Sequence, residues 1–82
     1  MEESKMELAI AMMLEEVNIY SRYAERAKAK NLPMEERDYL SRIVGIDRAM
    51  INLGWKLEEE EERVYCKDGE TIEYTHYRAI KR

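Results

Sequence analysis

Apolar residues recur at steps of three and four along the first third of the chain, which is the spacing of one helix face. The series is Met6, Ile10, Met13, Val17, Tyr20, Ala24 and Ala27. Ser4 and Glu7 stand three positions apart at its start, as in a capping box that binds the first free backbone N–H groups of a helix. We predict one helix over residues 4–30. It ends before Asn31, a residue that tolerates the left-handed backbone of a helix cap.

A second helical series follows Pro33, a residue favoured at the first position of a helix. Its apolar positions are Tyr39, Ile43, Ile46, Met50 and Leu53, and the face is widened by Leu40, Val44 and Ile51. Gly54 is suited to end this helix, which we predict over residues 33–53. Gly45 lies inside it, where glycine costs roughly 1 kcal/mol relative to alanine. We expect it to allow close approach of the first helix, which the short connection makes an antiparallel neighbour.

The period changes to two after the second helix, where apolar and charged residues alternate. We predict strands within residues 55–66 and 70–76, joined by a three-residue loop over residues 67–69. This register pairs Val64 with Ile72 and gathers apolar side chains on one face of the hairpin. A two-residue loop would instead divide that face, so the buried pattern favours the three-residue loop.

These elements predict a single α+β domain over residues 1–82. Its architecture is a long antiparallel helical hairpin followed by a C-terminal β-hairpin that packs on it. A hairpin of two strands is marginal in water and needs such support.

Residues 8–14 form an uninterrupted apolar run, LAIAMML, which covers the whole circumference of a helix. One side of this run faces the second helix. The residues on the remaining surface of the first helix are Leu8, Met12, Leu14, Ile19 and Tyr23. The β-hairpin is too poor in inward apolar residues to cover all of them. We therefore expect a homodimer with a two-fold interface on the first helix; the alternative is a monomer with a few exposed apolar residues, which soluble proteins tolerate.

The composition is 45% apolar and 39% charged, with a net charge of -4, which indicates a folded protein rather than a disordered one. One cysteine permits no internal disulfide, so stability has to come from helix packing or association. The single cysteine and the acidic start, which lacks the basic flank of a secretory signal, predict a cytoplasmic protein. No apolar run approaches the roughly 20 residues of a membrane span.

No arrangement of residues predicts catalysis. Cys66 and His76 are the one pair that suggests a nucleophile and a base, but the predicted hairpin separates them by about 20 Å. We expect Cys66 to be a small buried hydrophobe and His76 a surface residue. The acidic tract Glu58–Glu62 lacks the spaced ligands of a calcium loop, which makes it a solvated connector. The three glycines are isolated, so there is no phosphate loop, and we expect no enzyme, no cofactor and no metal.

The function we expect is a small non-enzymatic protein–protein interaction or regulatory module that self-associates through the first helix. One alternative is nucleic-acid binding through the basic, tyrosine-rich C-terminal hairpin. The element order over residues 33–76 resembles the last part of a winged-helix domain, which implies base stacking and phosphate contacts. The negative net charge disfavours a nucleic-acid partner. The other alternative uses Glu58–Glu62 as an acidic mimic that occupies the basic groove of a nucleic-acid-binding protein.

Overall fold

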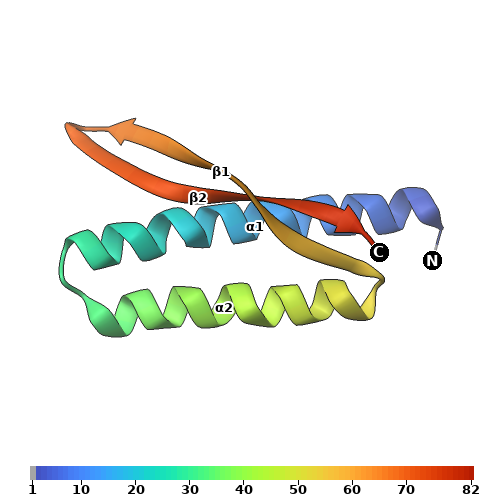
Figure 1. The fold of residues 1–82 in the computed structure, drawn as a ribbon. Coiled ribbons are helices and arrows are strands. Elements are labelled where there is room, and N and C mark those ends of the chain that lie inside the picture. Colours follow the sequence, from blue (N-terminus) through green and yellow to red (C-terminus); the bar gives the residue numbers. More distant parts are fainter. Residues whose placement is uncertain (1) are drawn as a thin grey trace.

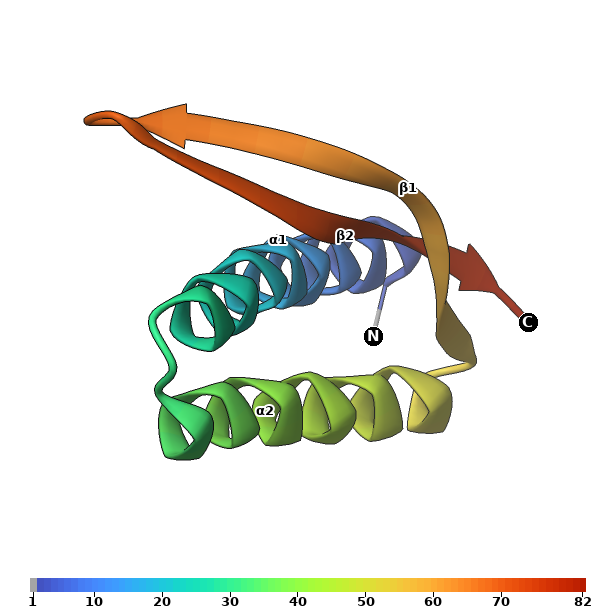
Figure 2. The same ribbon diagram turned by 60° about the vertical axis from the view of Figure 1, so that its left-hand side comes forward.

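The computed structural model describes residues 2–82, which form two helices followed by two strands (Figure 1). Helix α1 spans Glu3–Ala29 and helix α2 spans Pro33–Asn52, while strands β1 and β2 span Trp55–Lys67 and Glu70–Lys81. The helices are antiparallel, and α1 lies between α2 and the β-hairpin (Figures 1 and 2). The predicted α+β architecture, a helical hairpin with a β-hairpin packed on it, is confirmed.

The helix boundaries differ from the predicted ones by at most one residue, but the N-terminal cap was predicted wrongly. Glu2 is the N-cap of α1 and makes no side-chain cap hydrogen bond, and Ser4 lies inside the first turn. The two turns that follow the helices agree with prediction. Asn31 has a φ of 59° and Gly54 a φ of 87°, so both adopt the left-handed conformation that ends a helix.

The core lies along the contact between α1 and α2. Its buried apolar residues are Ile10, Val17, Ala24, Ala27, Ile43 and Met50, and the last of these and Val17 are fully enclosed. All six belong to the apolar series that predicted the two helices. The heptad-like spacing therefore identified the contact face correctly.

The predicted widening of the α2 face is wrong. Leu40, Val44 and Ile51 are 47%, 50% and 40% exposed, because α2 packs mainly against α1 and, near Leu57, against β1. The expected role of Gly45 is also wrong. A side chain at this position would meet no atom within 4 Å, so α1 makes no close approach there.

The hairpin turn contains two residues, Asp68 and Gly69, and the three-residue loop was predicted wrongly. Their φ values of 51° and 80° are the positive ones that a type I′ turn requires. In this register Tyr65, rather than Val64, stands opposite Ile72. The buried pattern misled the prediction because Tyr65 takes the inward position, where its ring packs against Arg22 of α1.

Both strands are longer than predicted, and the acidic tract belongs to β1 instead of forming a connector. A bulge between Glu59 and Glu61 leaves Glu60 without a partner in the strand register. Bulges strengthen the twist of a hairpin. β1 crosses over β2 as it rises from the end of α2 (Figure 1).

Candidate functional site

Two polar side chains of α1 bind the outer edge of β2. The Asn18 side chain accepts a hydrogen bond from the Tyr77 N–H at 2.7 Å and donates one to the Tyr77 C=O at 3.2 Å. The Ser21 hydroxyl donates to the Thr75 C=O at 2.6 Å. These side chains thus satisfy three backbone groups of β2, as a third strand would do along this part of the edge. Burial, with a smaller contribution from Glu59, raises the pKa of Tyr77 above its ordinary value.

Sequence reasoning missed this contact, although a signal was present. Asn18 and Ser21 interrupt the apolar surface of α1 on the side next to Val17. Ser21 is the one buried polar residue of the part of the chain that the structure describes. Polar residues at such positions need a partner, which here is backbone.

Tyrosine rings and arginine guanidinium groups form a second cluster that joins α2, α1 and β1. Tyr39 stacks on Tyr20 with centroids 6.0 Å apart and meets Tyr23 edge-on at 5.5 Å. The Arg22 guanidinium lies 5.4 Å from the Tyr23 ring and 4.1 Å from the Tyr65 ring. Each cation–π contact of this kind contributes about 0.5–1 kcal/mol at exposed sites, so the cluster supports the position of the hairpin over α1.

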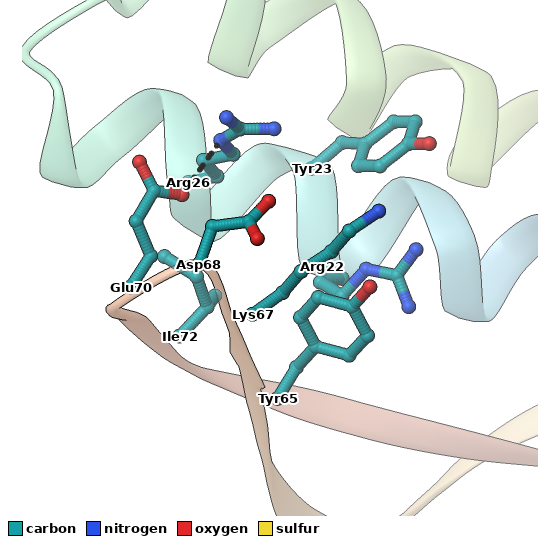
Figure 3. Close-up of a pocket in the computed structure, with 8 residues that line it drawn as sticks. All are labelled: Arg22, Tyr23, Arg26, Tyr65, Lys67, Asp68, Glu70 and Ile72. Atoms are coloured by element: carbon teal, nitrogen blue, oxygen red, sulfur yellow. Dashed lines mark ion pairs between the residues drawn. The ribbon is translucent and has the colours of Figure 1, made fainter.

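A cavity of about 300 Å³ opens beside this cluster, between α1 and the tip of the hairpin (Figure 3). Its lining residues are Arg22, Tyr23, Arg26, Tyr65, Lys67, Asp68, Glu70 and Ile72. Glu70 bridges Arg26 at 3.3 Å and Lys30 at 3.4 Å. The lining carries both signs of charge and contains no serine, cysteine, threonine or histidine.

The candidate catalytic pair is separated in the structure, as expected. Cys66 stands opposite Thr71 and His76 opposite Glu61, so the two lie at levels of the hairpin about 16 Å apart. Cys66 is exposed, and the expectation that it is buried was wrong, because the two-residue turn places it on the outer face. Across residues 2–82 no group of three histidine, cysteine or acidic side chains is placed to hold a metal ion.

Most charged residues of the acidic tract have a partner within the hairpin. The pairs are Glu58 with Arg78, Glu60 with His76, Glu61 with Arg63, and Glu62 with Thr75. Lys81 also lies 3.2 Å from Glu3 at the start of α1. Most of the acidic tract and several of the basic residues are therefore already engaged within the molecule.

The predicted interface residues of α1 fall into three groups. Leu8 and Met12 are 62% and 61% exposed, one helical turn apart. Tyr23 is 37% exposed and belongs to the tyrosine cluster. Leu14 and Ile19 are half-buried and line a hollow beside β2. The freely accessible part of the predicted interface is the pair Leu8 and Met12.

A longer row of exposed apolar residues lies on α2 and consists of Leu40, Val44 and Ile51, which we call the α2 stripe. Next to it is a groove of about 640 Å³, whose lining includes Arg37, Ser41, Gly45 and Arg48. Sequence reasoning assigned the uncovered apolar surface to the first helix. The structure leaves apolar side chains exposed on both helices.

Comparisons of this chain with protein-family models, with curated proteins and with solved structures find no match. Neither helix contains a stretch both long and apolar enough to cross a membrane, over the residues described.

Proposed function

We propose that the protein is a non-enzymatic protein–protein interaction module that self-associates through its helices. The observation that supports this proposal is that more large apolar side chains are exposed than apolar side chains are buried. Six apolar residues are buried, whereas nine large apolar side chains of residues 2–82 are at least 37% exposed. Exposed apolar surface concentrated on particular faces is typical of interaction sites, and small domains gain most from covering it.

The first surface available for association is the pair Leu8 and Met12 of α1. Each buried apolar side chain contributes about 1.5–3 kcal/mol, so covering both by another chain would stabilise a complex appreciably. The free thiol of Cys66 fits a reducing compartment, and we propose a cytoplasmic location on that basis.

The internal pairing of the hairpin charges favours self-association over the two alternatives. A nucleic acid bound by Arg63 and Arg78 would have to displace their contacts with Glu61 and Glu58. A basic groove that bound the acidic tract would compete with the same contacts. An apolar interface on the helices requires no such exchange.

Light scattering on a sizing column over a range of concentrations tests the proposal. We expect the wild type to approach the mass of two 9.9 kDa chains at high micromolar concentration. If α1 contributes, Met12→Glu lowers the dimer fraction, while Met12→Leu preserves it because the apolar surface is kept. A wild type that stays at the mass of one chain throughout would contradict self-association.

A further inference from the structure

Helix α2 is the outermost layer of the molecule, with a single element covering it along most of its length. It packs on α1 and meets β1 near its C-terminal end, where Asp47 accepts a hydrogen bond from the Leu57 N–H at 3.4 Å (Figure 2). The α2 stripe lies to one side of these contacts. Its residues follow one another at four and seven positions, which is the spacing of one helix face.

Along the helix axis, the residues of this face are arranged symmetrically about the level of position 42. At equal distances on either side stand Leu40 and Val44, then Arg37 and Asp47, then Pro33 and Ile51. Consider an antiparallel helix pair whose two-fold axis passes at the level of position 42. Leu40 of one chain then lies beside Val44 of the other, and Arg37 lies beside Asp47. Such a pair has two apolar layers at its centre, flanked on each side by a layer of opposite charges.

The charges decide between the possible orientations of a second helix. Arg37 is exposed and takes part in no ion pair within residues 2–82, and Asp47 is half-buried with one carboxylate oxygen bound to Leu57. A parallel pair would place Arg37 against Arg37 and Asp47 against Asp47. The antiparallel pair places each against the opposite charge, which makes the face complementary to itself.

The groove beside the stripe provides room for a neighbouring helix. Ser41 is small, and no atom lies within 4 Å of the place that a Gly45 side chain would occupy. Glycine inside a helix costs roughly 1 kcal/mol, and packing within this chain does not offset that cost. A helix of another copy that lies beside Val44 meets the small Ser41 at the border of the stripe, whereas Gly45 lies farther around α2.

We propose that a second copy of this chain docks on the α2 stripe and groove to form an antiparallel, two-fold α2–α2 pair. This inference rests on the proposed self-association and assigns it to α2 instead of to Leu8 and Met12. Helices of 20 residues are about 30 Å long, so the interface is at the small end of the stable range. We expect a micromolar dissociation constant.

A charge exchange tests both the surface and the orientation. Arg37→Asp and Asp47→Arg each replace two opposite-charge contacts by two like-charge contacts, so each raises the dissociation constant about tenfold or more. An equimolar mixture of the two variants forms a heterodimer, since all four charges are then matched again. Sedimentation equilibrium measures the association, and circular dichroism verifies the fold of each variant. Lys28→Glu, the same type of charge change at an exposed position of α1, leaves the constant unchanged.

A second test uses Val44→Glu and Val44→Ile and leaves Asp47, which also binds Leu57, unchanged. The first is expected to abolish association at concentrations where the wild type is dimeric, and the second to preserve it. If Val44→Glu and the charge variants associate like the wild type while Met12→Glu does not, self-association stands and its assignment to α2 is overturned. A wild type that never associates overturns both proposals.

Discussion

Asn18 and Ser21 position a strand although both lie in a helix. A carboxamide carries a donor and an acceptor side by side, as a peptide group does, so Asn18 can hold both the N–H and the C=O of Tyr77. The Ser21 hydroxyl adds a bond to Thr75 two residues away. The two side chains thereby determine where β2 lies along α1.

Removing the carboxamide should destabilise the fold. Asn18→Ala leaves both backbone groups of Tyr77 without their partner, and we expect the free energy of unfolding to fall by about 2 kcal/mol. Urea unfolding followed by circular dichroism measures the change. Asn52→Ala, at the exposed end of α2, should alter stability by less than about 0.5 kcal/mol. An equally small effect of Asn18→Ala would contradict the structural role of this residue.

The β-hairpin is the element whose register the turn decides. Asp68 and Gly69 both adopt positive φ, and a two-residue turn of this type matches the right-handed twist of the strands. Val64 consequently points away from α1 and is 62% exposed, while Tyr65 packs against Arg22. The register of the hairpin is therefore decided by the geometry of the turn and by the tyrosine cluster. Pairing of the aliphatic residues Val64 and Ile72 contributes less.

Engineered cysteines can distinguish the two registers. Val64 and Glu73 stand directly opposite each other in the structure. The backbone groups of Thr75 and Tyr77 point away from β1 and bind α1, and hydrogen bonding alternates along a strand. We therefore infer that Val64 and Glu73 form a non-hydrogen-bonded pair. Such pairs have Cα atoms about 4.5 Å apart, which suits a disulfide. In a Cys66→Ser background, Val64→Cys with Glu73→Cys should oxidise readily. Val64→Cys with Ile72→Cys should remain reduced by mass spectrometry and thiol titration; the reverse result would restore the three-residue loop.

The whole molecule is a thin, elongated body with extents of 43 × 23 × 17 Å. The helices and the β-hairpin lie one upon another, and within residues 2–82 Val17 and Met50 are the large side chains that are fully enclosed. A body of this shape has much surface for its volume, so its own core contributes less to stability than that of a rounder domain. The self-association that we propose would add to the stability of such a chain.

The thermal midpoint should therefore depend on protein concentration. Binding that occurs only in the folded state stabilises it by mass action, and we expect the midpoint to rise about 3 °C for each tenfold increase in concentration above the dissociation constant. Differential scanning calorimetry measures this shift. A constant midpoint between low and high micromolar concentration would argue against a folded dimer.

The buried face of the two helices and the two turns that follow them were predictable from the sequence alone. Val17 and Met50 lie in the core because their spacing places them on one helix face, and Asn31 and Gly54 end the helices through their own backbone preferences. These features depend on residues close together in the chain, so local pattern and conformational preference are sufficient to predict them.

The tertiary structure alone decided which surfaces are covered. Asn18 binds Tyr77 across 59 positions of sequence, and no local pattern specifies that meeting. The same holds for the α2 stripe, whose apolar residues would suit a core equally well. It is exposed because α1 and the hairpin pack on each other and leave one side of α2 without a neighbour. Whether a side chain is buried depends on elements that are distant in the sequence, so it is decided only when those elements pack together.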